Sequence, residues 1–216
     1  MTGRPKSFDK DSLMNSAVKL FWKQGYQATS VRDVAAAAGL TTGTLYNEFG
    51  GKEDLYAAAV THYVSTIIYP RVDKILLSNP DDFPQLGSKL GTDGTPSDRI
   101  HYFLSSSVHG LPKSVAHQAC LLINTQMEVD LSKSKAIKQA LSKGLKYIER
   151  GLTLQLNEHF KKDSNTQNVP AALVQINIFM TGLLLTAKSR QQSSELLPAI
   201  DQFMANTFHQ QALQQQ

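Results

Sequence analysis

The sequence predicts an all-α protein in which a small three-helix domain precedes a larger helical domain. No alternation of apolar and polar residues is long enough to indicate a strand. Apolar residues recur instead at spacings of three and four, and Gly and Pro separate the segments that they define. The 216 residues, 41% of them hydrophobic, are enough to bury a substantial core. We expect about nine helices, divided into domains at 1–51 and 52–216.

Three short helices are predicted first, and the turn between the second and third is the most informative part of the chain. Ser30 and Asp33 have the spacing of a capping box at the start of the second helix, and Gly39 follows its end. Gly50 and Gly51 close the third helix. The predicted ranges are 9–24, 31–38 and 42–49.

The larger domain is predicted to open with a long helix from Lys52 to Ile68 or beyond, which Pro70 bends or ends. Residues 78–97 contain several Pro and Gly and are interpreted as a loop. The remaining predicted helices cover about 97–110, 115–129, 133–162, 169–189 and 194–209.

Charge and cysteine content limit the class of protein. The net charge of +4 is modest, yet the segment up to Arg32 carries six cations against two anions, an excess equal to that of the whole chain. A single cysteine excludes an internal disulfide. The first residues hold no secretion signal, and the apolar runs fall short of the roughly 20 residues of a bilayer span. We therefore expect a cytoplasmic protein without a membrane partner.

Residues 29–55 have the pattern of a helix-turn-helix, because two short helices are joined through a turn that contains Gly39. The second helix of such a pair enters the DNA major groove. Leu45 and Phe49, four residues apart, would face the domain core and leave small polar side chains outside. This pattern indicates double-stranded DNA as the partner.

The segment and its flanks contain a further set of residues, Gly25-Tyr26, Thr29-Ser30-Val31, Val34-Ala35, Ala38-Gly39-Leu40, Gly43-Thr44-Leu45-Tyr46, Phe49 and Lys52-Glu53-Asp54-Leu55. Through these residues the chain resembles the TetR family of transcriptional regulators over about residues 8–56. The resemblance implies a homodimer that binds a palindromic operator, most often as a repressor released by a small-molecule or electrophile effector. An activator, or a helical interaction module without DNA binding, remains an alternative.

The resemblance also implies roles for individual residues. The expected base contacts are Thr41, Thr42, Gly43 and Asn47. The expected phosphate contacts are Ser30, Thr44, Tyr46 and Lys52. Arg4 and Lys6 either lie as an arm in the adjacent minor groove or are incidental cations of a leader. Glu48 departs from this basic character, and it either turns toward Lys52 or accepts from a cytosine amino group.

Residues 169–189 are apolar on nearly every helical face, which is more than the core of one monomer requires of a single helix. We therefore expect a homodimer formed through 169–189 and 194–209, as the TetR resemblance also implies. The alternative is a central core helix of a monomer.

The TetR resemblance further implies a pocket for an unknown small-molecule effector in the larger domain. Cys120 opens a Cys-Leu-Leu-Ile-Asn segment similar to one in a TetR subgroup that includes the N-ethylmaleimide-reductase repressor, an electrophile sensor. A nearby His117 would favour a reactive thiolate, whereas a buried and inert cysteine is the other interpretation. The residues expected to line the pocket are Tyr63, Phe103, Ser107, Cys120, Asn124, Tyr147 and Gln175.

Catalysis is not expected. Gly-x-Ser-x-Gly, Gly-x-Gly-x-x-Gly and His-Glu-x-x-His do not occur, and Gly50-Gly51-Lys52 lacks the flanking residues of a phosphate-binding loop. His117 and Cys120 have no third metal ligand nearby in the sequence. We predict no catalytic residues, no cofactor and no metal.

Overall fold

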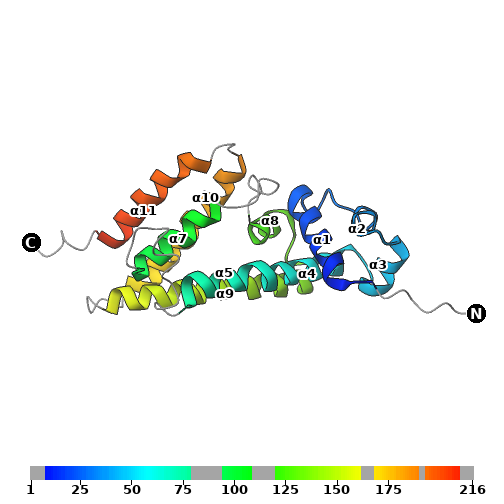
Figure 1. The fold of residues 1–216 in the computed structure, drawn as a ribbon, viewed down its shortest axis with the longest axis horizontal. Coiled ribbons are helices and arrows are strands. Elements are labelled where there is room, and N and C mark those ends of the chain that lie inside the picture. The colour runs from blue at the N-terminus through cyan, green and yellow to red at the C-terminus, as the bar shows by residue number, and fades with distance from the viewer. Residues whose placement is uncertain (1–7, 79–93, 109–119, 162–167, 190–192, 210–216) are drawn as a thin grey trace, which may run out of the picture.

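The computed structural model describes residues 8–78, 94–108, 120–161, 168–189 and 193–209. Within these ranges every regular element is a helix, which confirms the all-α prediction. Three helices form a compact head at one end of the molecule, and the other helices form the body behind it (Figure 1). Arg4 and Lys6 lie outside the described residues.

The head consists of α1 (Lys10–Gln24), α2 (Val31–Ala37) and α3 (Thr42–Phe49). Phe21 and Leu45 are almost fully buried at its centre. Gly39 has a φ of 67° between α2 and α3, a left-handed conformation that an L side chain adopts only with strain. The expected turn and the bounds of α3 are therefore confirmed.

One nearly continuous helical path leads from the head into the body. It comprises α4 (Lys52–Tyr63), the π-helical segment η1 (Val64–Ile68), α5 (Tyr69–Val72) and the π-helical segment η2 (Asp73–Leu77). The sequence predicts that Pro70 bends or ends this helix. The predicted end is wrong, because the helical path continues past Pro70 through α5 and η2. Proline normally clashes with the carbonyl four residues earlier, but η1 widens the turn before it, and the Tyr69 N–H donates to the Val64 carbonyl.

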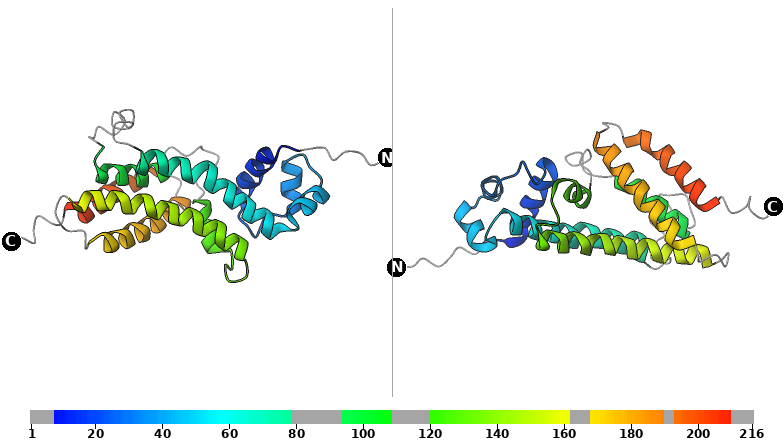
Figure 2. Two further views of the ribbon diagram at one scale, coloured as in Figure 1. Left: turned by 90° about the horizontal axis from the view of Figure 1, so that it is seen from below. Right: turned by 180° about the vertical axis from the view of Figure 1, so that it is seen from behind.

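The body contains the longest helix, α9 (Lys135–Lys161), which runs beside α4 and α5 in both views of Figure 2. Gly144 permits this approach, because a Cβ there would lie 2.7 Å from Val64 Cγ2. The other helices are α7 (Pro96–Val108), α8 (Leu121–Glu128), α10 (Val169–Ser189) and α11 (Leu197–His209), the last preceded by a 3-10 turn, η5 (Ser193–Leu196).

By length and hydropathy, α10 is the one helix in the described ranges that qualifies as a candidate membrane span, which the sequence interpretation did not expect. A single such helix is weak evidence, since core helices of soluble proteins meet the same criteria. The predicted bounds of 169–189 are confirmed. One side of α10, including Ile176 and Leu184, is buried in the body.

Candidate nucleic-acid interface and internal cavity

The exposed face of α3 is polar, and its opposite face anchors it in the head. Leu45 is 1% exposed, whereas Asn47 and Tyr46 face outward. Thr41 caps the helix, since its Oγ1 accepts from the Thr44 backbone N–H at 3.2 Å and lies 2.9 Å from the Thr44 hydroxyl. The two hydroxyls are thus positioned together at the N-terminus of α3, where Thr42 is half-buried.

Ser30 is engaged in the capping box that the sequence predicts. Its backbone N–H and hydroxyl donate to Asp33 Oδ2, at 2.8 and 2.6 Å, and its oxygen accepts from the Asp33 N–H. These hydrogen bonds lower the pKa of the Asp33 carboxyl. The N-terminus of α2 therefore already holds a carboxylate, with which any phosphate at Ser30 would have to compete.

Lys52 is held against the turn that follows α1. Its Nζ lies 4.5 Å from the centre of the Tyr26 ring and donates to the Gln27 carbonyl at 3.1 Å. The expectation that Glu48 turns toward Lys52 is wrong, because Glu48 Oε1 instead accepts from Lys10 Nζ at 2.8 Å. This pairing neutralises the one acid on the outer face of α3.

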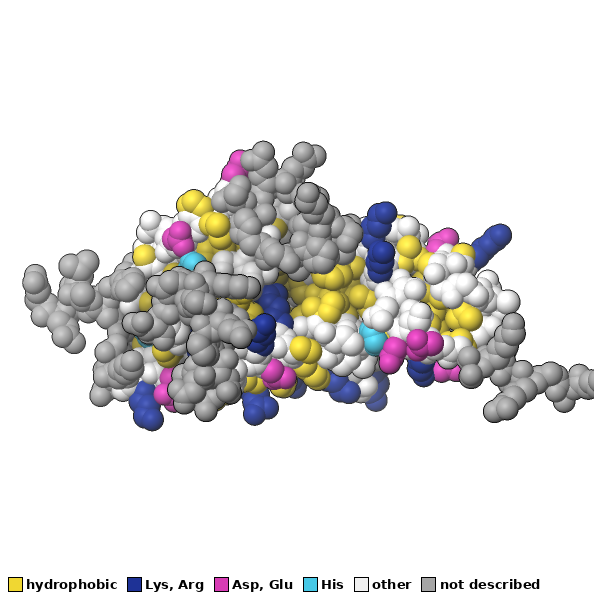
Figure 3. Space-filling model, viewed as in Figure 1, with side chains coloured by type: hydrophobic (Ala, Val, Ile, Leu, Met, Phe, Trp, Pro, Cys, Tyr) yellow, Lys and Arg dark blue, Asp and Glu magenta, His cyan; other side chains and the backbone are white. Residues whose placement is uncertain are grey.

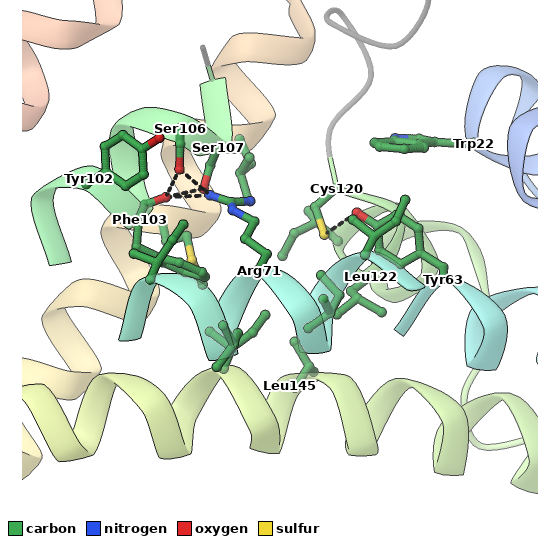
Figure 4. Close-up of a pocket in the computed structure, with 18 residues that line it drawn as sticks. Trp22, Tyr63, Arg71, Tyr102, Phe103, Ser106, Ser107, Cys120, Leu122 and Leu145 are labelled. Carbon is green, nitrogen blue, oxygen red and sulfur yellow. Dashed lines mark hydrogen bonds between the residues drawn. The ribbon is translucent and has the colours of Figure 1, made fainter. Parts of the chain in front are cut away.

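A cavity of about 320 Å³ lies in the body next to the head. Figure 3 shows hydrophobic side chains gathered in a hollow on this side of the molecule. The cavity wall is mainly apolar and is built from α1, the α4–η2 path, α7, α8, α9 and α10. Its polar groups are Tyr63, Arg71, Tyr102, Ser106, Ser107 and Cys120 (Figure 4).

Four of the residues expected at an effector pocket line this cavity: Tyr63, Phe103, Ser107 and Cys120. The other three, Tyr147, Gln175 and Asn124, do not line it. The Tyr147 ring packs against the Tyr69 ring at an interplanar angle of 47°, and its hydroxyl donates to Asp73 at the surface. Gln175 is exposed on α10. Asn124 is buried outside the cavity wall and accepts from Lys188.

Arg71 is the charged cavity residue that the sequence interpretation missed, together with the polar residues Tyr102 and Ser106. A signal was present, because Arg71 lies at helical spacing from Ile67, Ile68 and Ile75 and thus interrupts an apolar face. The adjacent Pro70, however, is typical of a helix end.

Cys120 lies at the start of α8 with its Sγ 3.4 Å from the Tyr63 hydroxyl. Burial and the neighbouring sulfur raise the pKa of Tyr63 well above its usual value. His117 lies outside the described residues, so the structure leaves the thiolate and inert interpretations open. Within the described ranges, no three His, Cys, Asp or Glu side chains come together in a way that could hold a metal.

Helix α8 joins the cavity to the head. Leu122 and Ile123 at its start line the cavity. At its end, the Glu128 carboxylate accepts from the Tyr26 backbone N–H at 2.7 Å, and the Glu128 carbonyl accepts from the Gln27 side chain. A shift of α8 would therefore act directly on the turn that also holds Lys52.

The outer face of α10 carries two exposed apolar side chains one turn apart. Val174 is 56% and Ile178 is 69% exposed, whereas Leu184 is buried and lines the cavity. The interpretation of α10 as apolar all round is therefore refined: among the described residues, one face of the helix is buried in the body and the other exposes Val174 and Ile178.

Comparison with known proteins supports the sequence interpretation. Residues 13–59 match the family model described as bacterial regulatory proteins, tetR family. The chain is 48% identical over 62 residues to the HTH-type transcriptional repressor ComR of Escherichia coli, covering 29% of this chain and 30% of that protein. It is 25% identical over 126 residues to the uncharacterized HTH-type transcriptional regulator YezE of Bacillus subtilis, covering 58% and 57%. The matches thus span between about a third and somewhat over half of these relatives.

Solved structures share the fold over nearly the whole chain. A cysteine mutant of the TetR family regulator CifR, solved with a 26-base-pair double-strand operator DNA, matches with a TM-score of 0.72 and 21% identity over 93% of this chain and 98% of that one. The regulatory protein TetR of Rhodobacter sphaeroides matches with a TM-score of 0.74 and 20% identity over 94% and 100%. Reduced NemR of E. coli matches with a TM-score of 0.64 and 16% identity over 92% and 95%. These likenesses concern the fold, and the proposed kinship of the Cys120 segment stays a prediction.

Proposed function

The N-terminal part of this chain belongs to the tetR family of bacterial regulatory proteins, and from that premise we propose that the chain is a repressor that binds a palindromic operator as a homodimer. The observation that carries this proposal is α3, with Leu45 buried and polar residues facing outward. Such a helix can lie in the major groove with its N-terminus leading, so that Thr42, Gly43 and Asn47 reach base edges. The same role places the protein in the cytoplasm.

Dimerisation through α10 and α11 is supported by the exposed Val174 and Ile178. A two-fold axis across this face would bury both residues of each copy and present two α3 helices to two half-sites. This account also explains the hydropathy of α10 by burial against protein on both sides, without a bilayer.

We further propose that a ligand in the cavity releases the operator through α8. The ligand would contact Leu122 and Ile123, and a displacement of α8 would move Glu128 and the turn at Tyr26 that it holds. The head would then change its orientation relative to the body, and the spacing of the two α3 helices would no longer fit the two half-sites. Such coupling requires a ligand that binds the two states with different affinity.

A selection from a random double-stranded DNA library with the purified protein tests the proposal. Enrichment of one motif with two inverted half-sites is the expected result. Protein that retains its helical fold but enriches no sequence would indicate an interaction module without DNA binding. A reporter placed behind the selected operator distinguishes repression from activation, because the protein should lower its expression.

A further inference from the structure

Arg71 places a guanidinium in the wall of an otherwise mainly apolar cavity. Its Nη2 donates to the Ser106 hydroxyl at 3.0 Å, to the Ser107 hydroxyl at 2.6 Å and to the Phe103 carbonyl. Its Cζ lies 4.5 Å from the centre of the Phe103 ring. Figure 4 shows the guanidinium directed at the end of α7 that carries these residues. The side chain is thus fixed on one side by neutral groups.

No carboxylate forms an ion pair with Arg71 in the described part of the chain. The ion pairs found there join Lys10 to Glu48, His101 to Asp201, Lys133 to Asp130 and Lys188 to Glu128, none of them at the cavity. Burial lowers the pKa of Arg71, and the nearby tyrosines and Cys120 only oppose this effect. An arginine nevertheless keeps its proton in proteins, so the cavity holds a positive charge.

An unpaired charge in an apolar site is costly to the folded protein and is normally balanced by a counter-charge. Nη2 is the donor in every hydrogen bond between Arg71 and a described residue. The N–H groups of Nη1 and Nε therefore remain available to donate to a ligand. An oxyanion bound there would form charge-assisted hydrogen bonds, which are shorter and stronger than those of a neutral acceptor.

The apolar part of the cavity wall favours a ligand with an apolar tail. Leu122, Leu145 and Met180 contribute apolar surface, and the volume of about 320 Å³ is at the lower end of the range for small-molecule pockets, about 300–1,000 Å³. A highly charged ligand would leave charges without partners in this site, and a large ligand would exceed its volume.

We propose that this cavity binds a small amphipathic monocarboxylate, with its carboxylate on Arg71 and its apolar part against α8, α9 and α10. Binding itself follows from the cavity, and only the role of the carboxylate as effector rests on the proposed function. The carboxylate would supply the anion that Arg71 lacks within the described residues.

Paired ligands of equal shape test this inference. Octanoate and octanamide differ in charge at the head group, as do 3-phenylpropanoate and 3-phenylpropanamide. Titration calorimetry on the full chain at pH 7.5 should show binding of at least one carboxylate, at least tenfold tighter than its amide. Arg71→Met should remove this preference and leave amide binding unchanged. Lys74→Met removes an exposed cation from the same helical path and should bind as the wild type does.

The inference is overturned if the amides bind as tightly as the carboxylates, if Arg71→Met binds the carboxylate as the wild type does, or if neither carboxylate binds. Should Arg71→Met fail to fold, Arg71→Lys, which keeps the charge, must retain the preference. Operator binding is measured separately. A carboxylate that binds without releasing operator DNA confirms the site and contradicts its effector role, whereas a protein that binds no operator contradicts the proposed function alone.

Discussion

Replacement of Ile178 by Asp on the outer face of α10 is expected to separate the proposed dimer into folded monomers. Ile178 is 69% exposed in the single chain, so most of its side chain is still available to be buried by a partner. A two-fold interface contains each substituted position twice. The effect of one substitution on association is therefore doubled, while the core of each subunit is unchanged.

The size of the effect follows from the exposed fraction of Ile178. Full burial of an Ile side chain contributes about 1.5–3 kcal/mol, so the part still exposed contributes roughly 1–2 kcal/mol per copy and about 2–4 kcal/mol per dimer. This corresponds to a dissociation constant weakened by roughly 30- to 1,000-fold. Two aspartates desolvated at the interface would weaken association further.

Sedimentation velocity over a concentration series measures this change, and thermal unfolding followed by circular dichroism checks the fold. Leu154→Asp is the matched control, because Leu154 is 44% exposed on α9, outside the proposed interface, and should leave the dimer intact. Leu184→Glu should instead unfold the chain, because Leu184 is 6% exposed inside the body. A wild-type chain that is monomeric at micromolar concentration, or an Ile178→Asp chain that dimerises normally, would refute the reasoning.

Three further predictions concern the head and the cavity. Glu128→Ala removes the acceptor of the Tyr26 N–H and should reduce the effect of a bound ligand on operator affinity. Asp130→Ala, at an exposed position, should leave this effect unchanged. An equal ligand effect on operator affinity in both variants would contradict the proposed path through α8. Gly39→Ala imposes a Cβ at a φ of 67° and should destabilise the head by about 1 kcal/mol, measured by urea unfolding; no loss would contradict the strain. N-ethylmaleimide should block ligand binding by alkylating Cys120, the single cysteine, and Cys120→Ser should be insensitive to the reagent; unimpaired binding after full labelling would place the thiol away from the ligand.

The head was largely predictable because its signals are local. The capping box at Ser30, the positive φ of Gly39 and the bounds of α3 each depend on residues a few positions apart. The orientation of α3 followed from the spacing of Leu45 and Phe49. Helical periodicity likewise gave the bounds of α10.

Contacts between distant residues could not be predicted in this way. Glu128 binds the Tyr26 backbone N–H, which is 102 positions away in the sequence. Glu48 pairs with Lys10 and not with Lys52, the partner expected from its position four residues away. An apolar helix indicates burial but does not show which of its faces packs in the monomer and which meets a partner. The sequence alone therefore could not predict that Leu184 is buried and Ile178 exposed. The helix continues past Pro70 because a wider turn precedes it, and this placed Arg71 in the cavity wall.

A salt titration of operator binding tests the central claim most directly, with Lys52→Ala and Asn47→Ala measured on operator and scrambled duplexes. We expect Lys52→Ala to weaken binding to both duplexes alike and to lower the salt slope by about one. Asn47→Ala should cost on the order of 1–3 kcal/mol on the operator alone, relax the preference at one position of each half-site and leave the slope unchanged. If Lys52→Ala changes the sequence preference while Asn47→Ala weakens all duplexes equally, α3 does not read bases through its exposed face and the account is contradicted.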